Sequence, residues 1–158
     1  MPESGAVLRP ARPDDETAIL ALTSRLADFT LPPGRTAHEI AVADHPMLRA
    51  QLADPHDDVL FLVAHDETGA LLGSVFANTR RDYFTNAANA YVEVLAVADA
   101  AAGRGVARTL MDAVESWAGA RRLARVDLSV FSANRRARGF YEHLGYQEEL
   151  VRYVKPIP

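Results

Sequence analysis

The order of the hydrophobic patterns constrains the fold of this chain more than any other feature. Helical spacing of apolar residues follows a short strand pattern near the start, strand patterns fill the middle, and the two alternate after Gly105. This order predicts a mixed sheet with helices on both faces, in one domain of the α/β or α+β class. Strands are expected at Val7–Arg9, Val59–Ala64, Leu71–Thr79, Tyr91–Val97, Val126–Val130 and Tyr146–Val154.

Helix start and stop signals divide the segments between these strands. A helix is expected from Pro13 to about Phe29, because acidic residues follow Pro13 and favour a helix N-terminus. Thr36 and Glu39 have capping-box spacing, which predicts a second helix that Pro46 kinks or breaks. Two further helices are expected, from Gly105 to Ala120 and from Asn134 to Leu144.

Length and composition fit a single globular domain. A chain of 158 residues, with 49% apolar and 24% charged residues, is expected to form one domain over 1–158 with a core from about 7 to 154. The absence of cysteine excludes disulfides, thiolate metal sites and a cysteine nucleophile. No stretch has the roughly 20 apolar residues that span a membrane, and residues 1–10 lack the features of a signal peptide. We therefore expect a cytoplasmic protein.

Charge is divided unevenly along the chain. Residues 1–100 carry 7 basic and 15 acidic side chains, a balance of −8, whereas residues 101–158 carry 10 and 6, a balance of +4. A basic segment in a chain of net charge −4 suggests that this segment holds an anionic ligand. The alternative is that both sets of charges are solvated surface.

A glycine-containing loop joins the strand expected at Tyr91–Val97 to the next helix. At such a junction, the unpaired backbone N–H groups and the helix dipole favour a phosphate, and Arg104 and Arg108 add positive charge. The alternative is that this glycine-containing loop only joins the strand to the helix and binds no ligand. The P-loop pattern is absent, and the dinucleotide fingerprint fits Gly103 and Gly105 but lacks its third glycine, because residue 108 is Arg.

A second informative segment runs from Asn134 to Tyr146. Gly139 within the expected helix costs roughly 1 kcal/mol relative to Ala, so a ligand or a backbone segment is expected to lie against it. Ala137 and Tyr141 are four residues apart and share one side of that helix. Phe140 and Leu144 are expected to be core residues.

Together these segments resemble two motifs of the GNAT superfamily of acetyl-CoA-dependent N-acyltransferases. The segment Ala102–Ala107 is similar to the pyrophosphate motif, except that Ala102 stands where Arg or Gln is usual. The second motif matches at Asn134, Ala137, Phe140, Tyr141, Leu144, Gly145 and Tyr146. The resemblance covers nearly the whole chain and implies a mostly antiparallel sheet of six to seven strands. In that sheet the parallel pair Tyr91–Val97 and Val126–Val130 is expected to splay apart.

The resemblance also implies direct transfer of an acetyl group from acetyl-CoA to a primary amine. It places the pantetheine arm against the backbone of Leu95, Ala96 and Val97. The pyrophosphate is expected at the amides of Gly103, Arg104, Gly105, Val106, Ala107 and Arg108. Asn134, Ala137, Phe140 and Tyr141 are expected to complete the acetyl-CoA site. Tyr141 resembles the general acid that protonates the departing thiolate, and a backbone N–H near Val97 is expected to stabilise the oxyanion.

Glu93 is the candidate base that accepts a proton from the amine. It is an acid within an otherwise apolar strand, where a charge is costly unless it is solvated or paired. If Glu93 faces the cleft, it can attract a cationic substrate or accept its proton through water. The alternative is an outward-facing, solvated Glu93, with Tyr91 on the same face as the fallback candidate.

Other patterns give no further site. His38 and Glu39 begin a zinc motif that fails at Val42, and the stretch His56–Asp58 is expected to be a solvated loop, so no metal is expected. The basic cluster Arg121, Arg122 and Arg125 suits a helix C-terminus, and no nucleic acid or membrane partner is expected.

Two other functions and several acceptors stay open. A catalytically idle acyl-CoA-binding module is the main alternative to an enzyme, and a nucleotide-dependent oxidoreductase is a third hypothesis. The acceptor can be a polyamine, an amino-sugar, an amino-acid derivative or a protein N-terminus, with a small molecule favoured. The family resemblance also implies a homodimer as one expected assembly.

Overall fold

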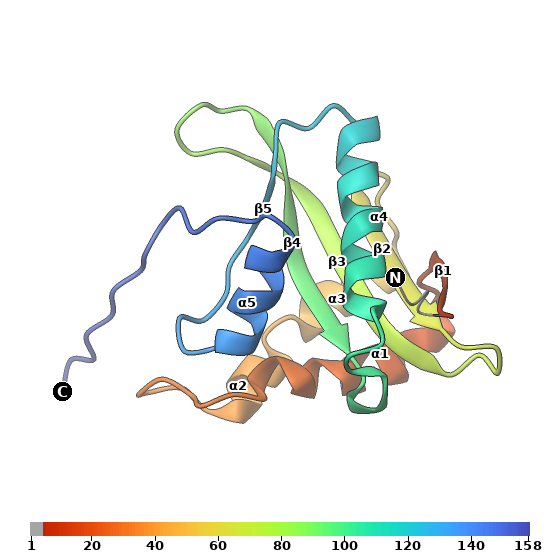
Figure 1. Ribbon diagram of the computed structural model, residues 1–158, viewed down its shortest axis with the longest axis horizontal. Coiled ribbons are helices and arrows are strands. Elements are labelled where there is room, and N and C mark those ends of the chain that lie inside the picture. Colours follow the sequence, from red (N-terminus) through yellow and green to blue (C-terminus); the bar gives the residue numbers. More distant parts are fainter. Residues whose placement is uncertain (1–4) are drawn as a thin grey trace.

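The computed structural model describes residues 5–158, and a five-stranded sheet is its centre (Figure 1). The first four residues, part of the stretch assessed for a signal peptide, lie outside the described residues. The strands lie in sequence order across the sheet, antiparallel except for the last pair, which is parallel. They are β1 (Val7–Pro10), β2 (Val59–His65), β3 (Leu71–Arg81), β4 (Ala88–Val97) and β5 (Val126–Leu128).

The parallel pair separates toward one end of the sheet. β4 pairs with β5 only from Ala90↔Val126 to Val92↔Leu128, while its pairing with β3 continues to Val97↔Gly73. From Glu93 onward, the edge of β4 that faces β5 therefore has no strand partner among the described residues. The expected splayed pair is present, although β5 ends at Leu128 and not at Val130.

Helices cover both faces of the sheet, as the sequence predicts. They are α1 (Glu16–Leu22), α2 (Ala37–Val42), α3 (His45–Ala53), α4 (Val106–Ala120) and α5 (Arg135–His143). Short 3-10 turns occupy Pro13–Asp15, Thr23–Ala27 and Asp99–Ala101. None of the helices within residues 5–158 is long and apolar enough to cross a membrane.

Two helix boundaries differ in detail from the expectation. The first helix ends at Leu22 and continues to Ala27 as a 3-10 turn. The expected capping residue Thr36 does cap α2, since its Oγ1 accepts a hydrogen bond from the Glu39 amide at 3.2 Å. The expected second helix is interrupted, because α2 ends at Val42 and α3 begins at His45. Pro46 is at this interruption. It lies in the first turn of α3, where its missing N–H has no helical acceptor and its φ suits a helix start.

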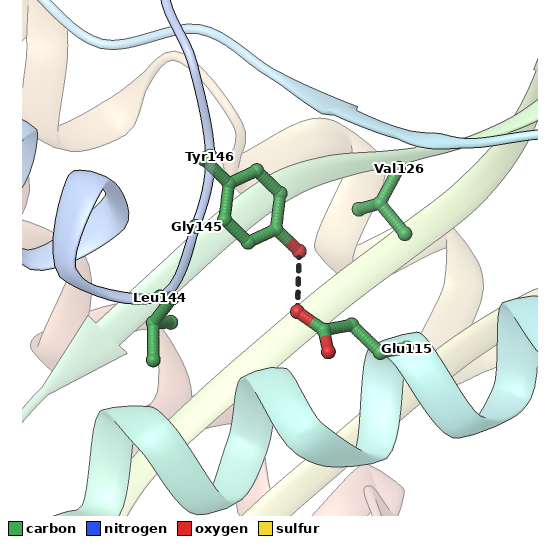
Figure 2. Close-up of a pocket in the computed structure, with 5 residues that line it drawn as sticks. All are labelled: Glu115, Val126, Leu144, Gly145 and Tyr146. Atoms are coloured by element: carbon green, nitrogen blue, oxygen red, sulfur yellow. Dashed lines mark hydrogen bonds between the residues drawn. The ribbon is translucent and has the colours of Figure 1, made fainter.

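The strand expected at Tyr146–Val154 does not form, so the sheet has five strands and not six or seven. After α5 the chain turns at Gly145, which has φ +93°, and Tyr146 then donates a hydrogen bond to Glu115 of α4 at 2.9 Å (Figure 2). Glu148 and Glu149 pair with Arg138 and Arg125, respectively. Side-chain contacts, and not a strand ladder, therefore fix the start of this segment.

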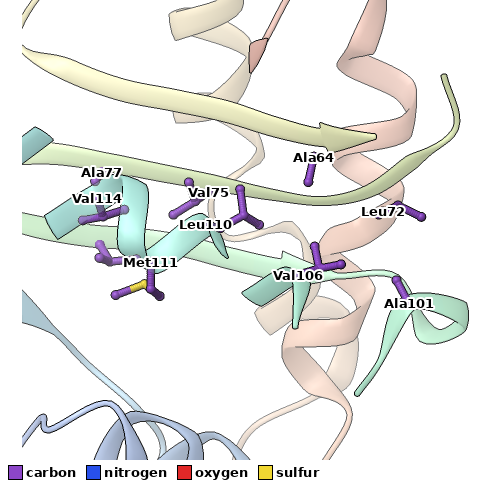
Figure 3. Packing of buried hydrophobic residues seen from close by; sticks show 10 residues of the cluster. Ala64, Leu72, Val75, Ala77, Ala101, Val106, Leu110, Met111 and Val114 are labelled. Atoms are coloured by element: carbon purple, nitrogen blue, oxygen red, sulfur yellow. The ribbon is translucent and has the colours of Figure 1, made fainter. Parts of the chain in front are cut away.

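Two apolar clusters lie on opposite faces of the sheet. On the α4 face, Leu110, Met111 and Val114 pack against Val75 and Ala77 of β3 (Figure 3). On the other face, Ile19 of α1 and Leu48 of α3 pack with the strand residues Val63, Phe76 and Val94. The continuous apolar run Val59–Ala64 is explained by this arrangement, because its alternate residues enter different clusters.

Candidate active site

A cavity of about 850 Å³ lies where β4 separates from β5. Its wall combines the ends of these strands with the start of α4, with α5, and with the segment from the second 3-10 turn, Thr23–Ala27, to the start of α3. All the residues that the sequence assigns to a site line it, with the exception of Arg104: Glu93, Leu95, Ala96, Val97, Gly103, Gly105, Val106, Ala107, Arg108, Asn134, Ala137, Phe140 and Tyr141. The structure therefore brings together segments that are far apart in the sequence.

The glycine turn presents the N-terminus of α4 to this cavity. Gly103 has φ +76° and Gly105 has φ +79°, a left-handed conformation that favours glycine at both positions. Gly105 is the N-cap of α4, and no side chain caps the helix there. The first amides of a helix have no acceptor within it, so the N–H groups of Val106, Ala107 and Arg108 can bind an anion. Arg108 and Arg136 add positive charge to the wall, whereas Arg104 is exposed and lies outside it.

The end of β4 offers a free backbone edge. Leu95 to Val97 lie beyond the last β4–β5 pair and line the cavity, so an extended ligand can lie along this edge. One group there is already engaged, because Nε of Arg25 donates to the Val97 carbonyl at 3.3 Å. Arg25 thereby links the second 3-10 turn to the end of β4.

Helix α5 contributes one face to the same wall. Asn134 is its N-cap, and its Oδ1 accepts a hydrogen bond from the Ala137 amide at 3.1 Å. The Nδ2 group is therefore the part of Asn134 suited to a ligand. Gly139, in contrast, is exposed and has open space around the position of a Cβ atom. Within residues 5–158, no backbone segment lies against Gly139, so that part of the expectation is wrong.

Tyr141 is a partly buried residue of the wall. Its ring packs edge-on against Phe140 and Tyr146, with ring centroids 5.1 Å and 5.7 Å away. Burial raises the pKa of Tyr141 to about 12. Its phenol is thus a protonated hydrogen-bond donor throughout the physiological pH range.

Glu93 faces the cavity and is paired, so it is not the outward, solvated residue of the alternative interpretation. Its side chain is only 11% exposed. Oε1 accepts hydrogen bonds from Nδ2 of Asn78, at 3.0 Å, and from Arg80. Both bonds end on Oε1, which leaves the lone pairs of Oε2 for a substrate. The fallback candidate Tyr91 lies outside the cavity wall and shares a hydrogen bond with Ser129 at 2.8 Å.

The sequence did not single out the acidic side of the cavity opposite the glycine turn. Asp28 pairs with Arg25 there, and Glu39 pairs with Arg35. Asp44 has no ion-pair partner within residues 5–158. Burial raises the pKa of the Asp44 carboxyl above its usual value, and the negative charge of Glu93 raises it further. The acid surplus of residues 1–100 was the only sequence signal for this side.

A second hollow of about 250 Å³ lies between α4 and the segment after α5 (Figure 2). Glu115, Val126, Leu144, Gly145 and Tyr146 line it. Burial raises the pKa of Tyr146, and its hydrogen bond to Glu115 raises it further. None of the residues that the sequence assigns to a site lines this hollow. Within residues 5–158, no group of three His, Cys, Asp or Glu side chains is placed to hold a metal ion.

A model of the acetyltransferase (GNAT) family matches residues 23–146, which is most of the chain and includes the whole glycine turn and α5. The chain belongs to the GNAT acetyltransferase family. The cavity therefore lies within the region that defines this GNAT domain.

The relatives of this GNAT domain agree with that assignment. The mycothiol acetyltransferase of Beutenbergia cavernae is 38% identical over 100 residues, which are 63% of this chain and 32% of that protein. The chain thus spans about a third of the length of this curated relative.

Solved structures share the fold at low identity. A mutant form of the BH1408 protein of Bacillus halodurans superposes with a TM-score of 0.79 at 19% identity, over 96% of this chain and 99% of that one. The glucosamine-6-phosphate N-acetyltransferase of Arabidopsis thaliana superposes with a TM-score of 0.69 at 15% identity, over 97% and 99%. At these identities the likeness shows a common fold.

Proposed function

We propose that this GNAT domain transfers an acetyl group from acetyl-CoA directly to a primary amine, with a small molecule as the acceptor. The observation that carries the proposal is one cavity whose wall includes the glycine turn, Tyr141 and Glu93. Its volume of about 850 Å³ lies within the range of roughly 300–1,000 Å³ that is typical of ligand pockets. Membership of the family supports the reaction class.

The pyrophosphate of acetyl-CoA is proposed to bind at the start of α4. Three first-turn amides and the side chains of Arg108 and Arg136 supply donors and positive charge there. Ala102 lines the cavity but offers no side-chain donor where the family usually has Arg or Gln. Backbone groups must therefore carry most of the phosphate contact, and Arg108 is the proposed compensation.

The pantetheine arm is proposed to lie along the free edge of β4. The backbone of Leu95 to Val97 has no β5 partner there, so it can hydrogen-bond an extended chain as a strand would. Nδ2 of Asn134 is a further donor on the opposite side, since its Oδ1 already caps α5.

The acceptor amine is proposed to enter from the acidic side. Asp44 attracts the ammonium form, and Oε2 of Glu93 accepts its proton, directly or through one water. The neutral nitrogen then attacks the thioester carbonyl, so that a C–N bond forms. A backbone N–H near Val97 is proposed to stabilise the oxyanion, and the C–S bond breaks as the carbonyl reforms. The nitrogen loses its second proton in this collapse, which balances the proton that the departing thiolate takes up.

Tyr141 is proposed to assist the departing thiolate. A thiol has a pKa near 8.5, so a phenol whose pKa is about 12 is the weaker acid of the two. Its burial thus favours a hydrogen bond to the developing thiolate. Complete proton transfer from the Tyr141 hydroxyl requires that the bound ligand lower the pKa of the phenol.

An acyl-CoA-binding module without turnover is the second candidate, and the missing side chain at Ala102 is the observation that favours it. Measurement of CoA release separates the two. Acetyl-CoA is mixed with spermidine, glucosamine 6-phosphate, an amino-acid amide or a short peptide, and products are identified by mass spectrometry. CoA release with an N-acetylated product supports the enzyme. Binding of acetyl-CoA without turnover on any amine supports the module.

The remaining expectations about the protein are proposals of the same kind. They are one catalytic domain over 1–158, a cytoplasmic location, and a reaction that involves no metal, nucleic acid or membrane. The homodimer that the family resemblance implies is also a proposal.

A further inference from the structure

Two phenylalanine rings stack at the wall of the large cavity. Phe131, in the loop between β5 and α5, lines this cavity and is 37% exposed. Its ring lies against that of Phe29, with the ring centroids 5.3 Å apart and an angle of 34° between the planes. Among the described residues, neither ring belongs to the two apolar clusters that form the core. An exposed aromatic ring outside the core, at a cavity wall, is available to a ligand.

The contact between the two rings joins segments from opposite ends of the chain. Phe29 follows the second 3-10 turn, on the segment that supplies the acidic side of the cavity, and Figure 1 shows this segment beside the start of α5. The Phe29 amide donates a hydrogen bond to the Ala27 carbonyl at 2.9 Å. The Phe131 carbonyl accepts one from the Asn134 amide at 2.9 Å. Phe131 therefore contacts the acidic side through its ring and the proposed pantetheine site through its backbone.

The carboxyl group on the acidic side has apolar neighbours along the cavity wall. Asp44 is partly buried, and the segment that carries it also lines the cavity with Leu26, Ile40 and Ala43. Phe131 adds an aromatic face to this apolar wall. A carboxylate beside apolar side chains suits an ammonium group attached to an apolar body, because each part of such a ligand meets its own kind of surface.

The cations on this side are already engaged by acids. Arg25 pairs with Asp28 and, at 3.4 Å, with Asp99, and Arg35 pairs with Glu39 at 3.3 Å. The Nη2 atom of Arg25 has no hydrogen-bond partner within residues 5–158, but this atom is itself buried, so a ligand does not reach it. A carboxylate or phosphate on the acceptor therefore finds no free cation on the acidic side, and its burial there is costly.

The acids of the wall limit the number of ammonium groups in the same way. Asp28 and Glu39 are paired with the arginines beside them, and Glu93 is paired with Arg80. Among the described acids of the wall, Asp44 alone has no ion-pair partner. The charges on this side therefore match an acceptor with one ammonium group better than a polyamine.

We infer that the acceptor is an arylalkylamine, which is a single primary amine on a short alkyl chain that ends in an aromatic ring. Its ammonium group is bound at Asp44, and its ring packs against Phe131, which Phe29 supports. Phe131 is thus a specificity-determining residue. This inference rests on the proposed function and names the substrate class of the same site.

The test compares kcat/KM for four amines that differ in one feature each. The reference is 2-phenylethylamine. Ethylamine lacks its ring, phenylalanine adds a carboxylate, and spermidine replaces the ring by further ammonium groups. The inference predicts that kcat/KM for 2-phenylethylamine exceeds that for each of the others at least about 100-fold, because ring packing and unpaired charges both discriminate.

Phe131→Ala tests the ring itself. This substitution is expected to lower kcat/KM for 2-phenylethylamine about 30-fold and to change that for ethylamine less than about threefold, because only the first amine has a ring to lose contact. Phe84→Ala is the matched control. Phe84 is 71% exposed in the segment between β3 and β4 and lies outside the cavity wall, so kcat/KM for both amines should stay as in the native enzyme.

Calorimetry without acetyl-CoA separates this inference from the proposed function. The Kd of 2-phenylethylamine is expected to be at least about 30-fold lower than that of ethylamine, with no turnover needed. If no amine is acetylated, the proposed function fails, and equal affinity for these two amines then overturns the inference as well. If acetyl transfer occurs, three results overturn the inference alone. They are equal or faster transfer to ethylamine, equal or faster transfer to phenylalanine or spermidine, and a Phe131→Ala variant that matches Phe84→Ala.

Discussion

Tyr141 is the residue on which the proposed chemistry depends most directly. Its phenol lies in the cavity wall, is partly buried and stays protonated at neutral pH. Tyr141→Phe removes only the hydroxyl group, so we expect kcat to fall about 100-fold while the Kd for acetyl-CoA changes little. Steady-state kinetics and calorimetry measure the two quantities.

Tyr146→Phe is the matched control for that substitution. Tyr146 also has a raised pKa and a ring packed against Tyr141, but it lies outside the large cavity. The Tyr146→Phe substitution is expected to change kcat by less than about threefold. An unchanged kcat in Tyr141→Phe, or an equal loss in both variants, removes Tyr141 from the mechanism.

Substitution of Asp44 tests whether the acidic side of the cavity binds the acceptor amine. Asp44→Asn keeps a residue suited to the N-cap of α3 and removes one negative charge, so the KM for a cationic amine should rise about tenfold. Since the pKa of Asp44 is raised, protonation at moderately low pH removes its charge, and the KM of the native enzyme should rise as pH falls through that pKa. Asp44→Asn should lack this rise.

Asp54→Asn, at the C-cap of the same helix, is the control for Asp44. It is expected to leave the KM and its pH dependence as in the native enzyme. If Asp44→Asn and Asp54→Asn give the same KM at every pH, Asp44 has no part in acceptor binding.

Single residues were predictable from the sequence where local geometry demands a residue type. Gly103 and Gly105 adopt positive φ, so their spacing before a helix already indicated the turn. Asp44 and Arg25 were not predictable, because tertiary packing alone brings the segments before β2 to the cavity. Arg104 lies outside the cavity wall, and the sequence could not show this, because a position between two glycines says nothing about the direction of the side chain.

The start of α4 is the element that the proposed site needs most. Gly105→Glu places a carboxylate at the N-cap, where we propose the pyrophosphate binds, so acetyl-CoA affinity should fall at least about 100-fold by calorimetry. The substitution also strains a residue with φ +79°. Strain of this kind costs roughly 1–2 kcal/mol of folding free energy.

Gly69→Glu is the control for that strain. Gly69 has φ +87° in the turn between β2 and β3, with open space around it. The Gly69→Glu variant should lose about as much folding stability as Gly105→Glu and keep its affinity for acetyl-CoA. Retained affinity in Gly105→Glu means that the phosphate does not bind at this helix.

Helices and strands were predictable from the periodicity of apolar residues, except where a strand also needs a neighbouring strand to pair with. Helix α4 and the strands from β2 to β4 follow their patterns, because each pattern matches a face that packs within the domain. The pattern of Tyr146–Val154 is equally regular, yet no strand forms there. A strand needs a free edge within reach, and a sequence pattern carries no information about that edge.

Across the whole molecule, the uneven division of charge along the chain gives the cavity an acidic end and a basic end. Residues 1–100 supply all the acidic groups of its wall, and residues 101–158 supply only the cations Arg108 and Arg136. Arg25 and Arg35, from the acidic part, pair with acids beside them. The cavity thus has an anion-binding end at α4 and an acidic end at α3, which matches acetyl-CoA on one side and an amine on the other.

Hydrogen exchange with and without acetyl-CoA locates the ligand on the chain and so tests whether acetyl-CoA binds between β4 and the start of α4. We expect slower exchange of the amides of Leu95 to Val97 and of Val106 to Arg108 when acetyl-CoA binds, with no change at Gly69. Acetyl-CoA that binds without protecting either segment, or that fails to bind at all, would contradict it.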